Sequence, residues 1–302
     1  MILMVIFTYA IMWATFTDAD NIGGVAMKLN REELCHEARN VLDKINDGEF
    51  PEVYEYLDGI LIDEDVITAS PYEIAATLGK CDNPKPFPPF LIDFITGLFD
   101  CEITEGNTDA MCELGGYYYD GGRGFEQSFA KAVQLYKMAA EQGNRYAYNC
   151  LGYCYYYGRD MEPDYEKAFR CFAMGAFAGQ LESMYKIGDM YLRGQFVDKD
   201  EQEAFIIYNR CLEMMDDDSR SYVAGPVHLR LGDMCLKGVG TVADPEAALF
   251  HYNLAEILLY RMVKDGNYMY KKSLRLSIEG QAKARAALAD HIPVDEWIDE
   301  PI

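Results

Sequence analysis

Apolar residues recur at helical spacing through most of residues 107–265. In the stretch NTDAMCELGGYYYDGG, Ala110, Leu114 and Tyr118 are four positions apart and form one stripe of a helix. The next stretch, FEQSFAKAVQLYKMAAEQG, carries a second stripe that includes Phe129, Ala132, Val133, Tyr136, Ala139 and Ala140, and it ends at Gly143. The pattern predicts two amphipathic helices of about a dozen or more residues each.

This two-helix pattern occurs four times. Its first block is aliphatic-Gly-x-x-Tyr/Cys-x-x-Gly, and the copies begin at Leu114, Leu151, Ile187 and Leu231, at intervals of 37, 36 and 44 residues. Its second block is an alanine followed four positions later by an aromatic residue: Ala132/Tyr136, Ala168/Phe172, Ala204/Tyr208 and Ala248/Tyr252. One helix pair cannot bury both of its faces, so the repetition predicts a stack of neighbouring pairs.

Two glycines in each first block have different predicted tasks. The first removes side-chain bulk where two helices cross; these residues are Gly115, Gly152, Gly188 and Gly232. The second stands where a helix must stop, and glycine adopts the positive φ of such a stop without steric cost. The second set is Gly121, Gly158, Gly194 and Gly238.

The segments ELGGYYYDGGRGFEQSFAKAVQLYKMAAEQGN and CLGYCYYYGRDMEPDYEKAFRCFAMGAFAGQ resemble Sel-1-like repeats, which are related to tetratricopeptide repeats. The resemblance covers roughly residues 107–265. It implies an all-α fold, a right-handed superhelical α-solenoid of antiparallel helix pairs, and a scaffold for protein–protein contacts. The third copy departs from the pattern in RCLEMMDDD, and the fourth has Cys235 in place of the tyrosine. The longest interval predicts an insertion around MMDDDSRSYVAGP, as a longer helix end plus a loop.

The flanking segments are predicted to cap the solenoid. Residues 31–46 form a polar-faced helix, and SPYEIAATLG has a serine N-cap, a proline in the first turn and a closing glycine. The prolines of CDNPKPFPPF then interrupt the helix, and FLIDFITGLFDCEI covers the first repeat. We therefore expect a helical region at 28–89, a solenoid at 90–265 with repeats starting near 107, 144, 180 and 221, and a C-terminal capping helix with an acidic tail at 266–302.

Residues 1–27 begin with seventeen uncharged residues, MILMVIFTYAIMWATFT. This run is slightly shorter than the roughly 20 residues that a spanning helix needs. It has a passable signal cleavage site but no basic n-region. The alternatives are a signal or anchor, an apolar segment docked on the fold, and an over-extended start before Met27. We favour the last two together and expect a cytoplasmic protein, while an anchor stays open.

The charge, the cysteines and the missing motifs limit the classes of binding partner and the kinds of chemical site that we expect. A net charge of −23 disfavours nucleic acid and anionic membranes and favours a protein or peptide partner with a basic face. The nine cysteines include no CxxC motif and no repeated pairing scheme, which indicates free thiols in a reducing cytosol. The four histidines have no metal-ligand spacing, and no phosphate loop or nucleophile motif occurs. We expect no metal, no cofactor and no catalytic residues.

The tyrosines divide by helix face. Tyr118, Tyr155 and Tyr191 return to the core side and are predicted to pack between helices. The residues predicted to point away from it are Tyr119, Tyr153, Tyr156, Tyr185, Asp189 and Asp233. If the first helices line the concave surface, these six form an aromatic and acidic groove for a peptide or protein segment. Otherwise they pack between neighbouring units. The predicted function is a non-catalytic scaffold; the alternatives are an exported effector or surface protein, or a hydrolase acting on cell-wall or β-lactam-like substrates.

Overall fold

The computed structural model describes residues 31–45, 48–61, 67, 69–81, 85–215 and 222–291. The apolar segment at 1–27 and the acidic tail lie outside the described residues, so the predictions made for them stay predictions. Within the described ranges every regular element is a helix. They divide into an N-terminal unit that ends at Asp164 and a C-terminal unit that begins at Tyr165. This division falls inside the predicted solenoid, and each unit is described by itself.

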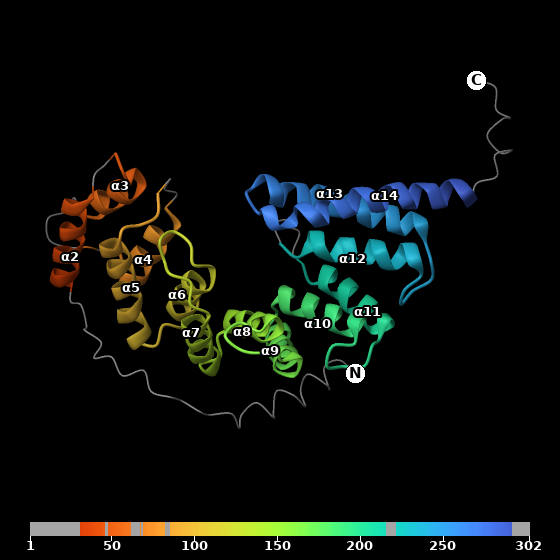
Figure 1. Cartoon of the computed structure of the whole chain (residues 1–302), viewed down its shortest axis with the longest axis horizontal. Coiled ribbons are helices and arrows are strands. Elements are labelled where there is room, and N and C mark those ends of the chain that lie inside the picture. The colour runs from red at the N-terminus through yellow and green to blue at the C-terminus, as the bar shows by residue number, and fades with distance from the viewer. Residues whose placement is uncertain are drawn as a thin grey trace, which may run out of the picture. The chain divides into compact units, whose positions relative to one another are not determined.

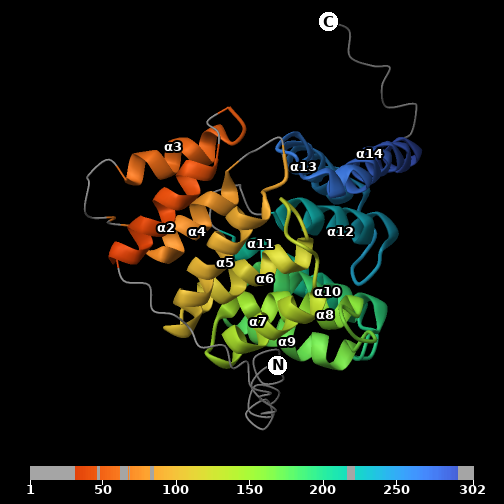
Figure 2. The same cartoon turned by 60° about the vertical axis from the view of Figure 1, so that its left-hand side comes forward.

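The N-terminal unit stacks helices one after another along the chain (Figures 1 and 2). Helix α5 packs between α4 and α6, α6 and α7 form a closely packed pair, and α8 continues the stack on α7. As predicted, α5 covers the first helix of the first repeat. The helices are α2 (Arg31–Lys44), α3 (Pro51–Ile60), α4 (Pro71–Lys80), α5 (Pro89–Thr104), α6 (Thr108–Asp120), α7 (Phe129–Glu141) and α8 (Arg145–Tyr157).

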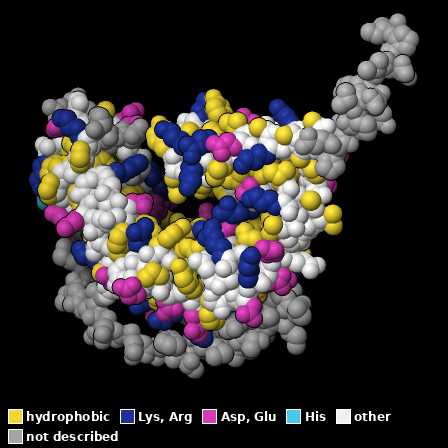
Figure 3. Space-filling view, turned by 45° about the vertical axis from the view of Figure 1, so that its right-hand side comes forward, with side chains coloured by type: hydrophobic (Ala, Val, Ile, Leu, Met, Phe, Trp, Pro, Cys, Tyr) yellow, Lys and Arg dark blue, Asp and Glu magenta, His cyan; other side chains and the backbone are white. Residues whose placement is uncertain are grey.

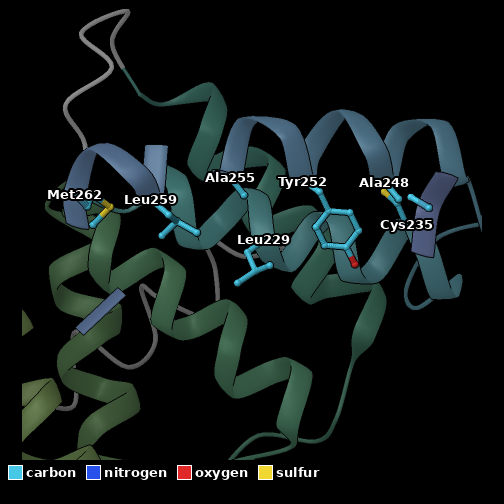
Figure 4. Close-up of a cluster of buried hydrophobic side chains, with 8 residues drawn as sticks. Leu229, Cys235, Ala248, Tyr252, Ala255, Leu259 and Met262 are labelled. Atoms are coloured by element: carbon cyan, nitrogen blue, oxygen red, sulfur yellow. The ribbon is translucent and has the colours of Figure 1, made fainter. Parts of the chain in front are cut away.

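The C-terminal unit repeats this arrangement. Helices α10 and α11 form one pair and α12 and α13 the next, and α14 runs along α13 (Figure 1). Side chains of α13 meet those of α12 in a buried cluster around Tyr252, which α14 closes with Ala284 (Figure 4). The elements are α9 (Tyr165–Phe177), α10 (Leu181–Arg193), α11 (Glu201–Glu213), α12 (Ala224–Lys237), α13 (Pro245–Lys264), the short 3₁₀ helix η1 (Tyr268–Tyr270) and α14 (Lys271–His291).

The two sequence blocks of a repeat meet at its helix crossing. A Cβ atom on Gly115 would lie 2.7 Å from Cε1 of Tyr136, and one on Gly188 would lie 2.7 Å from Cε1 of Tyr208. The same position in the last repeat, Gly232, faces Tyr252 at 2.8 Å. The first glycine of the motif is therefore the gap into which the aromatic ring of the second block fits, which explains why the two blocks recur together. The predicted close approach is confirmed in these three repeats.

The second glycine of each motif ends the first helix of its repeat. All four adopt the left-handed conformation, with φ of 62° at Gly121, 64° at Gly158, 66° at Gly194 and 66° at Gly238. A side chain at these positions would strain the backbone, so glycine is the residue that permits the turn. This prediction is also confirmed.

Two local predictions are wrong. Ser70 caps α4 in a capping box with Glu73, as expected, but Gly79 lies inside α4 and does not end it. Its missing side chain instead makes room for the hydroxyl of Tyr117. The long interval before the last repeat does not lengthen α11, which has 13 residues like α7 and α9, so the extra residues lie between α11 and α12.

Candidate functional site: an acidic and aromatic pocket

A pocket of about 420 Å³ opens on one face of α6 in the N-terminal unit. Helix α6 supplies one wall, Tyr72 comes from α4, and Tyr146 comes from the first turn of α8. We call it the acidic pocket; its lining residues are Tyr72, Asp109, Cys112, Glu113, Gly116, Tyr117, Asp120 and Tyr146. The α6 residues recur every three or four positions, so they share one helix face.

Helix caps fix the walls of the acidic pocket. The side chain of Asn107 accepts the backbone N–H groups of Asp109 and Ala110 at the start of α6. Asn144 caps α8 in the same way, and its Nδ2 also donates to Oδ1 of Asp109 at 2.8 Å. One asparagine therefore ties the start of α8 to the start of α6, which places Tyr146 at the pocket.

Two neighbouring residues of α6, Gly116 and Tyr117, form part of the lining of the acidic pocket. The ring of Tyr117 stacks on Phe125 with centroids 4.8 Å apart and contacts Phe99 at 6.0 Å. At the preceding residue, a Cβ atom on Gly116 would meet nothing within 4 Å. The absent side chain of Gly116 thus leaves space beside a fixed aromatic ring.

The pocket is negatively charged at its wall. Glu113 accepts a hydrogen bond from the hydroxyl of Tyr72 at 3.1 Å and pairs with Nζ of Lys80 at 3.1 Å. Burial, and next the Glu113 carboxylate, raise the pKa of Tyr72 to about 12, so this phenol stays neutral. Desolvation raises the pKa of the Asp120 carboxyl above its ordinary value. Three carboxylates and three tyrosine rings suit a cation on an apolar stem, which is the chemistry of a lysine or arginine side chain.

A second pocket, of about 290 Å³, lies in the C-terminal unit between α10 and α12. We call it the basic pocket; its lining residues are Leu192, Arg193, Arg230, Asp233, Met234, Lys237 and Val239. Asp233 is thus one sequence-predicted residue that lines a pocket, and its Oδ1 accepts the hydroxyl of Tyr252 at 2.7 Å.

Asp189 lies behind this second pocket, with 1% of its surface exposed. Its Oδ1 accepts Nε of Arg230 at 2.9 Å and the hydroxyl of Tyr208 at 2.7 Å. Arg193 approaches the other oxygen at 3.4 Å. Burial alone would raise the pKa of Asp189, but the two guanidinium groups lower it below its ordinary value. Half-buried Tyr185 packs against Tyr208 nearby. The structure brings Tyr185 and Asp189 together. Asp189 does not line the basic pocket, but it pairs with Arg193 and Arg230, which do.

The other predicted residues lie in the N-terminal unit in two groups that Arg159 joins, because its guanidinium lies over the rings of both Tyr119 and Tyr157. Tyr119 packs edge-on against Phe129, and its hydroxyl accepts Nε of Arg159 at 3.2 Å. In α8, half-buried Tyr153 stacks on Tyr157 with centroids 6.1 Å apart, while Tyr156 is buried and meets Tyr157 edge-on. None of these three lines either pocket. Their predicted binding role stays a prediction.

The two histidines of the last repeat face each other. Nδ1 of His228 in α12 lies 2.9 Å from Nδ1 of His251 in α13, so one ring donates and the other accepts.

Over the residues that the structure describes, no three metal-ligating side chains converge. Within the same residues, no helix is both long enough and apolar enough to cross a membrane.

Sequence reasoning missed most of the pocket residues, although a signal for them exists. Counting the helical rotation from a core position points to Tyr119, Tyr153 and Tyr156. The pockets are instead lined by residues at fixed offsets from the first glycine. In the first and last repeats they stand two positions before it, as Glu113 and Arg230, and five after it, as Asp120 and Lys237. Aligning the repeats on that glycine picks out these four positions by their charge, whereas Tyr72 and Tyr146 come from other helices.

Comparisons with known proteins agree with this architecture. The model of the Sel1 repeat matches residues 108–144, 145–179, 181–210 and 227–256. The crystal structure of a Sel1 repeat protein from Oxalobacter formigenes is similar, with a TM-score of 0.52 and 22% identity over 74% of this chain and 84% of that one. The structure of c5321, described as a protective antigen present in uropathogenic Escherichia coli strains displaying an SLR fold, matches with a TM-score of 0.50 and 16% identity. That match covers 84% of this chain and 56% of c5321. Curated proteins give no match.

Proposed function

Because the chain carries four Sel1 repeats between residues 108 and 256, we propose that it is a non-catalytic scaffold that binds a segment of a partner protein. Helical repeat solenoids of this class serve as extended binding surfaces. The acidic pocket on α6 carries the proposal, because it combines open space, rigid aromatic walls and unbalanced negative charge. A lysine or arginine side chain of the partner is the group that it accepts.

The pair between Lys80 and Glu113 supports this assignment. The ammonium group of Lys80 lies 3.1 Å from the Glu113 carboxylate, which shows that a cation fits at this wall. The Lys80 side chain is 70% exposed, so this contact is screened by water and contributes little to stability. A partner cation held between tyrosine rings would be less solvated and could replace Lys80 at Glu113.

A non-catalytic role also fits the rest of the chemistry. The half-buried histidines of the last repeat face each other rather than a serine or cysteine. We propose the cytoplasm as the compartment, because nine cysteines without a repeated pairing scheme suit a reducing environment. The alternative is an exported protein of the same fold, for which the apolar segment at 1–27 is the candidate leader or anchor.

Filling the pocket tests the proposal. The substitution Gly116→Leu places a side chain in the empty space beside Tyr117, and Gly97→Leu in α5 is the matched control, because a Cβ on Gly97 also meets nothing within 4 Å. The full chain and both variants are used to select from a library of random peptides displayed on phage. We expect enrichment of lysine and arginine with the parent chain and with Gly97→Leu, and loss of that enrichment with Gly116→Leu. Equal enrichment by all three proteins would refute the assignment to this pocket.

A further inference from the structure

The basic pocket is a local exception in a strongly acidic chain. The net charge of the chain is −23, yet Arg193, Arg230 and Lys237 line one small pocket together with Asp233. The space-filling view shows Lys and Arg side chains over the helices of the C-terminal unit (Figure 3). The field of the chain as a whole repels anions, so an anion can bind only where cations gather locally, and the basic pocket is such a place.

Arg230 is held in place from behind. Its Nε donates a hydrogen bond to the buried carboxylate of Asp189. Among the described residues, the guanidinium makes no other hydrogen bond. The same carboxylate accepts Tyr208, whose ring fills the gap at Gly188. The terminal amino groups of Arg230 are therefore positioned on a rigid base and have donors left for a ligand.

The charge at this face changes from the first repeat to the last. Two positions before the first glycine, the four repeats carry Glu113, Cys150, Lys186 and Arg230; five positions after it, they carry Asp120, Tyr157, Arg193 and Lys237. Both positions are acidic in the first repeat and basic in the third and fourth. The two pockets thus use the same positions of the repeat with opposite charge. Such a reversal gives the two pockets opposite ligand preferences.

We propose that the basic pocket binds a carboxylate of a partner peptide, from an aspartate, a glutamate or the chain end. A guanidinium presents paired N–H donors that match the two oxygens of a carboxylate. The Asp233 carboxylate in the same wall disfavours a doubly charged phosphate, whereas it can accept the backbone N–H that stands next to the carboxylate in a peptide. A volume of about 290 Å³ suits one such group rather than a larger ligand. This inference rests on the proposed function in taking the ligand to be a peptide.

Charge substitution at the pocket tests the inference, with random peptides displayed on phage and inorganic phosphate as the two probes. Lys237 is exposed and makes no contact with Asp189, so Lys237→Glu leaves the buried network in place. Its control is Lys283→Glu, which makes the same charge change at an exposed lysine of α14. Arg230→Gln is a second variant, used if its helical circular dichroism matches that of the parent.

We expect the parent chain and Lys283→Glu to enrich aspartate and glutamate, and Lys237→Glu to lower that enrichment by about fivefold, as for the loss of one well-placed charge pair. Unchanged enrichment in Lys237→Glu would overturn the proposal. Phosphate binding that depends on Lys237, without enrichment of acidic peptides, would also overturn it in favour of a phosphate site. Enrichment of basic residues alone would remove this inference and leave the proposed function standing, whereas no enriched peptide at all would remove both.

Discussion

Adjacent glycines in α6 should respond in opposite ways to the same substitution. Gly115 faces Tyr136 and Gly116 faces open space, yet both lie inside the helix. Replacing glycine by alanine in a helix interior stabilises it by about 1 kcal/mol, because the unfolded chain loses freedom. For Gly116→Ala nothing opposes this gain, so the free energy of unfolding should rise by about that amount.

For Gly115→Ala the new methyl group would lie 2.7 Å from a carbon of a ring that is 4% exposed. Either the ring or the helix must shift, and overpacking of this kind costs about 1–3 kcal/mol, more where the neighbours cannot move. After the gain in helix propensity is subtracted, we expect a net loss of up to about 2 kcal/mol. The two variants should therefore differ by about 1–3 kcal/mol in opposite directions from the parent.

Urea unfolding followed by circular dichroism measures both variants against the parent. Repeat proteins can unfold in more than one step, so the midpoint of the first transition and its slope are compared together. Thermal unfolding is a second readout, in which about 1 kcal/mol corresponds to roughly 2–4 °C for a chain of this size class. Equal effects of the two substitutions would show that the glycine in the motif does not act by admitting the tyrosine ring.

Three further predictions concern buried polar groups. Asp189→Ala leaves two arginines without their buried carboxylate and should lower the free energy of unfolding by about 3–5 kcal/mol. Asp233→Ala, at the same repeat position, removes only the hydrogen-bond partner of Tyr252 and should lower it by about 1 kcal/mol in the same urea assay. Burial, and next the charge of His251, lower the pKa of His228 to about 4. Between about pH 6.5 and 4 the unfolded chain therefore binds a proton that the folded chain does not, so the free energy of unfolding should fall as pH falls through that window. The fall should be less steep in His228→Gln. Burial raises the pKa of Cys112, Cys154 and Cys211 to about 12, so a thiol reagent at pH 8 should label these three only after denaturation; rapid labelling in the folded protein would contradict their burial.

Local rules in the sequence were enough to predict the repeating helix pairs. Amphipathic spacing indicated each helix, and the paired glycines indicated where helices cross and where they end. These features depend on residues close in sequence or on contacts inside one repeat, such as Gly115 with Tyr136. The resemblance to Sel-1-like repeats rested on the same residues. The handedness of the superhelix and the domain boundaries stay predictions.

Tertiary structure decided which side chains line a pocket. Rotation about one helix axis gives an approximate face, but it does not say which residues of the neighbouring helices stand opposite. Tyr72 reaches the acidic pocket because α4 packs on α5 and α5 packs on α6. Asp189, which the sequence places on the surface, is instead buried and pairs with two arginines. Those positions depend on long-range packing and on the desolvation of charge, which no local pattern contains. Local sequence patterns therefore predict the repeat and its helix crossings, whereas the place where charge and open space meet depends on how the helices pack against one another.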